Sequence, residues 1–225
     1  LFESPEEATR AYSRGLNYDA LEDALKYEGE QLKHCVGGYC PAVEIGESRI
    51  FSLRDADGTA RATIETRPQY SEFWSNLEKR EKAKGMSEKE WLEISNGWNF
   101  SKNLEPGKDQ LKRYLENKGI DMPEEMPQRI HQIKGMNNRK PPAEMIPFIQ
   151  DFVRSDKWKH VIDIENADMF EPNAAALSKL MPAAPDLADI GQARRLGAFN
   201  RAQEAGELNN FLTRDEWEDI LRRQI

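Results

Sequence analysis

Cysteine, histidine and long apolar runs are all scarce in this chain. Its 225 residues include two cysteines and three histidines. No stretch of about 18 apolar residues occurs, so the sequence contains no candidate membrane span and we expect no membrane partner. The opening stretch, LFESPEEATRAYSRG, lacks the charged-then-apolar order of a secretory signal. Few cysteines without a signal are typical of a reducing compartment, and we expect a cytoplasmic protein.

Positive charge is also in deficit. The 32 Lys and Arg residues are outnumbered by 40 Asp and Glu residues, which gives a net charge of −8 and a pI of about 5.1. Because Lys and Arg must neutralise phosphates to give affinity, this balance argues against non-specific nucleic-acid binding and leaves only a local basic cluster for that role. The chain begins with Leu rather than Met, so we expect it to be part of a larger polypeptide.

The motif KHCVGGYC, residues 33 to 40, contains both cysteines and one of the three histidines. A nucleophilic cysteine is activated by a nearby imidazole or by a helix N-terminus, which makes Cys35 a candidate. His34 is adjacent to it, but neighbours on a strand point to opposite faces, so His131 is the better candidate base. Backbone N–H groups at Gly37-Gly38 would hold an oxyanion. The alternative is a tight glycine turn flanked by two buried thiols.

The same residues allow a metal site as a third interpretation. His34, Cys35, Cys40 and His131 would total four zinc ligands. The H-C-x4-C spacing fits no common zinc finger, and there is no second CxxC motif. We therefore expect neither a metal nor another cofactor.

Alternating apolar and polar residues predict a β-hairpin at 49–67 and a third strand around 130–133. Between them, residues 69–128 are rich in Lys, Glu and Trp and are predicted to form a helical insertion. Helices are predicted at 4–15, at 18–32, at 87–94, at 108–117, at 143–155 and from Thr213 onward, where capping boxes or apolar spacings occur.

These elements predict an α+β fold. We expect a small antiparallel sheet of about three strands packed by helices, with a helical insertion and a helical C-terminal region. The α+β core would span residues 1–155, with the insertion at about 69–128, and the helical C-terminal region would span residues 156–225.

The hairpin carries four polar residues at alternating positions: Ser52, Arg54, Thr63 and Glu65. If the two strands place them on one face, the sheet presents a polar surface with one Arg–Glu pair. Glu65 would then be a candidate acid, base or orienting residue, and Gln132 of the third strand a second orienting residue. The alternative is the solvated face of an antiparallel pair.

A small positive cluster follows the third strand, in the segment HQIKGMNNRKPP. It contains Lys134, Arg139 and Lys140, with Asn137 among them. Loops after strands often carry function, and this one could hold one or two phosphates. These four residues are the candidate nucleic-acid contacts. The alternative is a capped strand end followed by a turn.

The stretch EGEQLKHCVGGYCPAVEIGESRIFSLRDADGTARATIE, followed later by IHQIKGMNNRKP, resembles the PcfJ-like proteins of conjugative plasmids, integrated elements and phages. The resemblance covers about residues 24–67 and 129–150, and its most specific part is the HCVGGY block with the hairpin after it. Members of that family accompany genes for DNA transfer and phage replication. The resemblance implies a joint role, in a site or in a polar core network, for His34, Cys35, Tyr39, Glu65, Gln132 and Asn137.

Three functions follow as hypotheses. The first is an accessory domain of a phage or mobile-element protein that acts in nucleic-acid transactions or on their protein machinery. The second is a cysteine-dependent hydrolase or transferase with Cys35 as nucleophile, His34 or His131 as base, and Glu65 or Gln132 as orienting residue. The third is a protein-interaction module, such as an inhibitor of a host defence system, since an acidic surface suits a basic protein partner.

Overall fold

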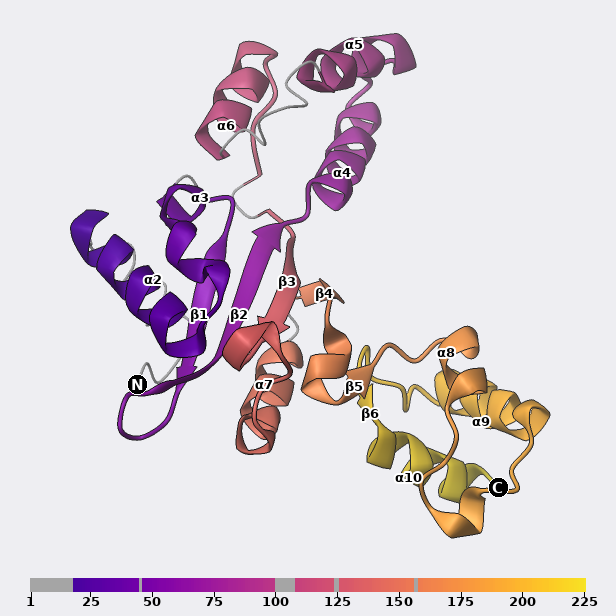
Figure 1. Ribbon diagram of the computed structural model, residues 1–225. Helices are drawn as coiled ribbons and strands as arrows, with labels where there is room; N and C mark the ends of the chain where they lie inside the picture. Colours follow the sequence, from indigo (N-terminus) through magenta and orange to yellow (C-terminus); the bar gives the residue numbers. More distant parts are fainter. Residues whose placement is uncertain (1–17, 45, 100–107, 124–125, 156–157) are drawn as a thin grey trace.

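The computed structural model describes residues 18–44, 46–99, 108–123, 126–155 and 158–225. Three lobes are visible in Figure 1: a central sheet with helices, a helical lobe formed by the insertion, and a helical lobe at the C-terminal end. The fold class is α+β, as predicted. The helix predicted at 4–15 lies outside the described residues. None of the helices in the described ranges is both long and apolar enough to cross a membrane.

The central sheet has the strand order β1-β2-β3-β4. β1 (Arg49–Arg54) and β2 (Ala60–Pro68) form the predicted hairpin, and its turn is closed by Asp55, whose Oδ1 accepts hydrogen bonds from two backbone N–H groups. β3 (Gln128–Lys134) pairs antiparallel with β2. These three strands are the antiparallel sheet that the alternation predicts.

Strand β4 (Trp158–Val161) adds a fourth member to the sheet, parallel to β3. A separate two-stranded sheet is formed by β5 (Met169–Phe170) and β6 (Leu212–Thr213). The sequence pattern predicts only helices in this part of the chain. Strands of two to four residues are too short for an alternation pattern to be recognised, and tertiary pairing decides their conformation.

Three helices cover one face of the sheet (Figure 1). They are α2 (Tyr18–Leu32) and the short helices η1 (Cys35–Gly38) and α3 (Cys40–Glu44). Leu21 and Leu25 of α2 are buried there, as the helical spacing predicts, and they belong to a cluster with Ile50 of β1. This arrangement places the HCVGGY block directly over the hairpin.

The opposite face carries the main hydrophobic core. The helices on this side are η3 (Ala143–Met145), α7 (Ile146–Val153) and η4 (Ile164–Ala167). They pack on fully buried strand residues such as Ile64 and Ile133. The same core includes Met169 and Phe211, so it draws on both sides of the predicted boundary at residue 155.

The insertion forms a lobe with its own hydrophobic core. Its helices are α4 (Tyr70–Ala83), α5 (Glu88–Asn99) and α6 (Lys108–Asn117). α5 begins at the predicted capping box, in which Ser87 and Glu90 hydrogen-bond to each other. The chain leaves α6 through Gly119, whose φ of 69° is left-handed and ends the helix close to the predicted bound at 117.

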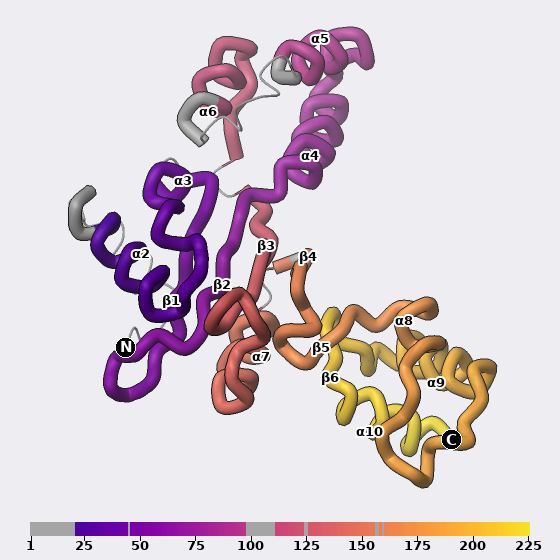
Figure 2. Tube along the Cα trace, viewed as in Figure 1, coloured from indigo at the N-terminus to yellow at the C-terminus, as the bar shows by residue number. Residues whose placement is uncertain are grey.

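The chain enters and leaves this lobe through two adjacent segments (Figure 2). Pro68 at the end of β2 is paired with Gln128 at the start of β3. The Gln69 N–H donates to the Pro127 carbonyl at 2.7 Å, which continues the pairing by one step into the lobe. The insertion is therefore attached to the sheet through one narrow root.

The C-terminal lobe contains the remaining helices. They are α8 (Ala174–Lys179), η5 (Pro185–Leu187), α9 (Gln192–Glu204) and α10 (Arg214–Gln224). α10 begins at the predicted capping box of Thr213 and Glu216 and buries Trp217 and Ile220. Glu216 also accepts two hydrogen bonds of 2.7 Å from Arg154, which link this lobe to the end of α7.

Candidate functional site

The HCVGGY block forms the turn between α2 and η1. After α2, Lys33 adopts a left-handed conformation with a φ of 52°, and the His34 N–H donates to the Gly29 carbonyl at 3.2 Å. Helix η1 then begins at Cys35. A Cβ at position 29 would lie 2.9 Å from the Gly37 nitrogen. The glycine at position 29 thus allows α2 and η1 to come into backbone contact.

Gly29→Ala is expected to destabilise the fold by about 1–3 kcal/mol, although alanine is the better helix former. The new methyl group would also meet the His34 carbonyl oxygen at 3.2 Å, so η1 would have to shift. Gly197→Ala in α9 is the matched control, because its Cβ meets only the end of the Arg201 side chain. That change should stabilise the protein by up to about 1 kcal/mol. Urea unfolding measures both, and effects of the same sign would contradict the close-contact argument.

The register of the sheet brings the predicted polar residues onto the face beneath α2 and η1. Glu65 lies opposite Gln132, and Thr63 lies opposite both Ser52 and Lys134. Opposite residues share a face of the sheet. Thr63 and Glu65 are buried, so the hypothesis of a solvated hairpin face is wrong for these two residues.

A buried glutamate from α2, which the sequence analysis passed over, organises one half of this face. Glu28 is 1% exposed and accepts hydrogen bonds from Ser52 Oγ at 2.6 Å and from Thr63 Oγ1 at 2.8 Å. Arg54 reaches the same carboxylate at 3.3 Å. The Arg–Glu pair expected within the hairpin therefore forms with Glu28 and not with Glu65, because Glu65 lies opposite Ile50, at the other end of β1 from Arg54.

His34 joins the turn to this cluster. Its Nδ1 accepts a hydrogen bond of 3.4 Å from the Val36 N–H, so the proton of the neutral ring lies on Nε2. Nε2 donates to Thr63 Oγ1 at 3.1 Å, and the Thr63 hydroxyl donates to Glu28. Both ring nitrogens are engaged in holding the turn on the sheet. His34 therefore has no free lone pair with which to act as the base for Cys35 that the sequence suggested.

The stability of the protein is expected to rise with pH across the range in which His34 titrates. Burial lowers the pKa of His34 below its ordinary value of 6.5. The unfolded chain then binds a proton more readily, so this contribution is complete above about pH 6.5 and is lost as pH falls through the folded-state pKa. His131 contributes in the same direction, since burial also lowers its pKa. Urea unfolding at several pH values should show a shallower slope for His34→Gln; an unchanged slope would contradict this assignment.

A second chain of hydrogen bonds leads from Cys35 to Glu65. The thiol of Cys35 lies 3.4 Å from the Tyr39 hydroxyl, and Gln132 Nε2 donates to the oxygen of that hydroxyl at 3.4 Å. The same amide nitrogen donates to Glu65 Oε2 at 2.5 Å. Three elements, η1, β2 and β3, thus meet in one polar network beside the thiol.

Glu65 anchors this network from inside the protein. Its side chain is fully buried, and Oε1 accepts hydrogen bonds from Ser48 Oγ at 2.7 Å and from Arg67 Nε at 2.6 Å. Both carboxylate oxygens are therefore occupied by donors. This geometry supports the orienting role among those predicted for Glu65 more than the role of an acid or a base.

Cys35 opens on a small pocket. Cys35 is exposed and Cys40 is buried, and neither forms a disulfide, so the hypothesis of two buried thiols is wrong for Cys35. The pocket has a volume of about 10 Å³, which is room for one water molecule. It is lined by His34, Cys35, Val36, Thr63, Gln132, Lys134 and Asn138. These residues come from the turn, from two strands and from the loop after β3.

His131, the base that the sequence analysis preferred, lies apart from the thiol. Glu65 pairs with Gln132 and Thr66 pairs with Ile130, so His131 is the extra residue of a β-bulge. It does not line the Cys35 pocket. Among the described residues, no histidine hydrogen-bonds to the thiol. The geometry therefore does not support His131 as the base, because the bulge displaces it from the alternation of β3.

The predicted basic cluster is largely neutralised. Lys134 pairs with Asp163 at 2.6 Å, and Lys140 pairs with Asp168. Both aspartates flank η4 in left-handed conformations, in a segment where the sequence offered no sign of a partner. Arg139 is exposed and forms no ion pair with any described residue. Within the described ranges, only Arg139 of this cluster is left without an ion pair, which is much less positive charge than the sequence suggests.

The loop after β3 is a tight turn around η2 (Met136–Asn138). Asn137 and Asn138 are left-handed, with φ of 56° and 58°, and they end the strand as predicted. Glycine is needed at 135, where a Cβ would lie 2.9 Å from Pro141 Cα. Asn138 reaches the Cys35 pocket, whereas the predicted contact Asn137 does not line it.

A metal centre finds no support in the geometry. In the part of the chain that the structure describes, no three His, Cys, Asp or Glu side chains come together as a metal site requires. Cys40 belongs to the hydrophobic cluster around Leu21 and Leu25, away from solvent. The four zinc ligands considered from the sequence therefore do not assemble.

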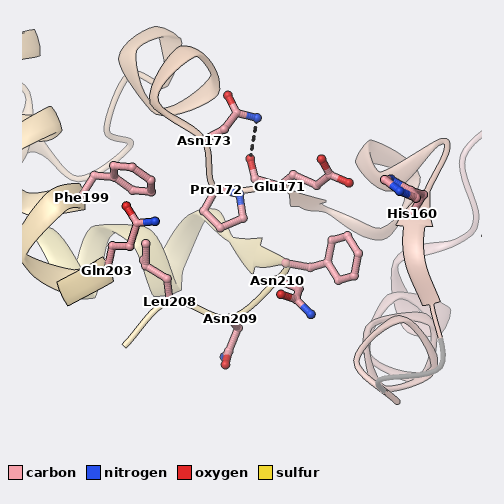
Figure 3. Close-up of a pocket in the computed structure, with 10 residues that line it drawn as sticks. His160, Glu171, Pro172, Asn173, Phe199, Gln203, Leu208, Asn209 and Asn210 are labelled. Atoms are coloured by element: carbon pink, nitrogen blue, oxygen red, sulfur yellow. Dashed lines mark hydrogen bonds between the residues drawn. The ribbon is translucent and has the colours of Figure 1, made fainter. Parts of the chain in front are cut away.

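A larger cavity, of about 560 Å³, lies beside the β5–β6 sheet (Figure 3). Figure 3 shows the Asn173 amide hydrogen-bonded to the Glu171 carbonyl, with His160 to one side and Gln203 to the other. The residues that line it are His160, Glu171, Pro172, Asn173, Phe199, Gln203, Leu208, Asn209, Asn210 and Phe211. They form no motif in the sequence, which is why sequence reasoning passed over them.

Neither a protein-family model, nor a curated protein, nor a solved structure matches this chain. The resemblance to PcfJ-like proteins therefore stays a prediction. Five of the six residues that it groups lie in the two hydrogen-bond chains around the turn: His34, Cys35, Tyr39, Glu65 and Gln132. Asn137 lies in the adjoining loop.

Proposed function

We propose that this chain is an accessory domain of a phage or mobile-element protein and that it acts as a cysteine-dependent hydrolase or transferase. One observation carries the proposal: the exposed thiol of Cys35 lies at a polar pocket, 3.4 Å from the Tyr39 hydroxyl. The resemblance supports it, because the residues that the resemblance groups surround this thiol. The ion pairs of Lys134 and Lys140 favour it over the nucleic-acid hypothesis.

Tyr39 is suited to donate a hydrogen bond to the sulfur of Cys35. Its hydrogen bond with Cys35, and then its burial, raise the pKa of Tyr39 above the ordinary value of 10.0. The hydroxyl therefore keeps its proton at neutral pH and can donate it to the sulfur. Gln132 donates to the oxygen of that hydroxyl, which leaves the O–H free to point at Cys35. Lys134 lines the same pocket, where its ammonium group is paired with Asp163.

The proposed reaction is acyl transfer. The thiol of Cys35 loses its proton to solvent, and its sulfur attacks a carbonyl carbon. A C–S bond forms, the bond to the leaving group breaks, and the leaving group takes up a proton from water. The acyl group then passes from the sulfur to water or another nucleophile, and Cys35 is released as the thiol. Glu65 acts through Gln132 and touches no reacting atom, so it is a positioning residue.

The test uses p-nitrophenyl acetate as the acyl donor. We expect a burst of one equivalent of p-nitrophenol, faster than the reaction of free glutathione at the same concentration, and an acetyl group on Cys35 by mass spectrometry. Cys35→Ser should abolish the burst, while Cys40→Ala should keep it, because Cys40 is buried. A rate no higher than that of glutathione would sink the proposal, since the thiol would then be exposed but not activated.

A second candidate function is binding of nucleic acid near the same pocket. It is favoured by Asn138 in the pocket lining and by Arg139 in the same loop, which is exposed and forms no ion pair with any described residue. Fluorescence anisotropy with a labelled single-stranded oligonucleotide at low salt tests it. Binding that weakens with added salt and with Arg139→Gln would support this function. Absence of binding at low salt would remove it.

A further inference from the structure

Two arginines face each other across the sheet at the root of the insertion. Arg67 of β2 and Arg129 of β3 are directly opposite in register, next to the Pro68–Gln128 pair. Cβ atoms of opposite residues in antiparallel strands lie about 5 Å apart, and like charges in such a pair destabilise the sheet. Two guanidinium groups at this spacing need a negative partner between them.

The carboxylate that pairs with Arg67 is already in use. Glu65 accepts one hydrogen bond from Arg67 Nε, and its oxygens also accept from Ser48 and Gln132. Arg129 forms no ion pair with any described residue, and its Nε is buried without a hydrogen-bond partner. One occupied carboxylate therefore faces two positive charges.

His131 adds a third nitrogen to the same neighbourhood. It follows Arg129 by two positions at the bulge, and its Nδ1 is also buried without a hydrogen-bond partner. Burial is the largest cause that lowers the pKa of His131, and the positive charges of Arg67 and Arg129 lower it further. Buried polar atoms in native proteins are nearly always paired, so two unpaired nitrogens on one short stretch of β3 point to a bound water or ion.

We propose that Arg67, Arg129 and His131 form a binding site for a phosphate group. Guanidinium groups recognise phosphate oxygens through parallel N–H···O bonds, and imidazole supplies a further donor. A bound phosphate removes the repulsion between the two arginines and gives the unpaired nitrogens an acceptor. The site carries local positive charge, so it attracts anions although the chain as a whole has a net charge of −8.

This site goes beyond the proposed function and does not rest on it. None of its three residues lines the Cys35 pocket. Cys35→Ser should therefore bind phosphate as tightly as the unchanged protein does. Failure of the acyl-transfer test and failure of the phosphate test are thus separate results.

The experiment is a titration of the full chain with sodium phosphate, with sodium chloride adjusted to keep the ionic strength constant. We expect a saturable rise in Tm with phosphate that chloride does not reproduce. Arg129→Gln should weaken phosphate binding about tenfold or more, measured by calorimetry. Arg49→Gln is the matched control, with the same change in charge. Arg49 pairs with Thr66, the neighbour of Arg67, so it points to the opposite face.

A second readout separates this site from a structural role for Arg129. In chloride alone, Arg129→Gln should leave the Tm unchanged or raise it, because it removes a like-charge contact. A residue that holds the sheet together would lower it. The proposal is overturned if the unchanged protein shows no saturable response to phosphate, or if Arg129→Gln and Arg49→Gln respond to phosphate alike.

Two oligonucleotides of one sequence, with and without a 5′-phosphate, identify the source of the phosphate group. Preference for the phosphorylated form that is lost in Arg129→Gln assigns the site to a terminal monoester. Equal binding of both forms, lost in the same variant, assigns it to the backbone diester. Binding of inorganic phosphate without either oligonucleotide assigns it to a small phosphorylated molecule.

Discussion

Glu65→Ala should destabilise the folded protein by about 3–5 kcal/mol, the range for removing one partner from a buried charged network. The Glu65 side chain is fully buried, and its carboxylate accepts hydrogen bonds from three donors: Ser48, Arg67 and Gln132. The alanine variant leaves a partly buried guanidinium without a counter-charge, beside a second arginine. It also releases Gln132, so the support of the Tyr39 hydroxyl is lost.

Equilibrium urea unfolding measures this loss. Glu93→Ala is the matched control, because Glu93 is an exposed glutamate on α5 and its removal should change the free energy of unfolding by no more than about 0.5 kcal/mol. Glu65→Gln should lie between the two, since it keeps an acceptor and loses the charge. A loss below about 1 kcal/mol for Glu65→Ala would mean that the network contributes little to stability and that the buried carboxylate is retained for another reason.

Cys35 should react with iodoacetamide at least about a hundredfold faster than Cys40 in the folded protein. Cys35 is exposed, whereas Cys40 is 3% exposed and packs with Leu21 and Leu25. Alkylation of Cys40 requires local opening, and an opening free energy of about 3 kcal/mol gives a factor of about a hundred. Peptide mass spectrometry over a time course follows both sites. Comparable rates would contradict the burial of Cys40.

Tyr39→Phe tests activation of Cys35 separately from its exposure. The variant keeps the ring and removes the hydroxyl that lies 3.4 Å from the thiol. Loss of one hydrogen bond to the reacting sulfur is equivalent to a rate about tenfold lower. An unchanged rate in Tyr39→Phe, with the fold intact, would mean that the Tyr39 hydroxyl does not assist the reaction of Cys35.

The parts of the fold that follow local patterns were predictable. The hairpin was visible from the alternation around the turn at Asp55, and α5 and α10 were visible from the capping boxes that begin at Ser87 and Thr213. Each of these signals lies within a few residues of the element it specifies. β4 was missed because its four residues become a strand only by pairing with β3.

Of the residues in the candidate site, only those from the turn and from the strands could be predicted from the sequence. Cys35, Tyr39 and Gln132 meet through strand register, which the pattern of the hairpin and β3 implies. Glu28 was passed over, although it follows Leu21 and Leu25 on the buried side of α2, where a charge needs partners. The helical spacing of residues 21, 25 and 28 was the signal from which the burial of Glu28 could have been predicted.

The charge of the loop after β3 could not be predicted, because its partners are distant in the chain. Lys134 and Lys140 are cations in the sequence and halves of ion pairs in the fold, with Asp163 and Asp168. The left-handed conformations of these aspartates depend on packing of η4 against the sheet. The same dependence on long-range pairing brings Arg67 and Arg129 together.

The narrow root of the insertion has a consequence for the order of folding. Pairing of β2 with β3 closes a long loop, and the entropy of closure rises with the length of the chain between the strands. The insertion has its own hydrophobic core, and its two ends are adjacent at Gln69 and Pro127. Once that lobe has folded, the loop that β2 and β3 must close is short, so early folding of the lobe speeds formation of the sheet. We therefore expect a folded insertion to favour the strand register in which Gln132 lies against Glu65.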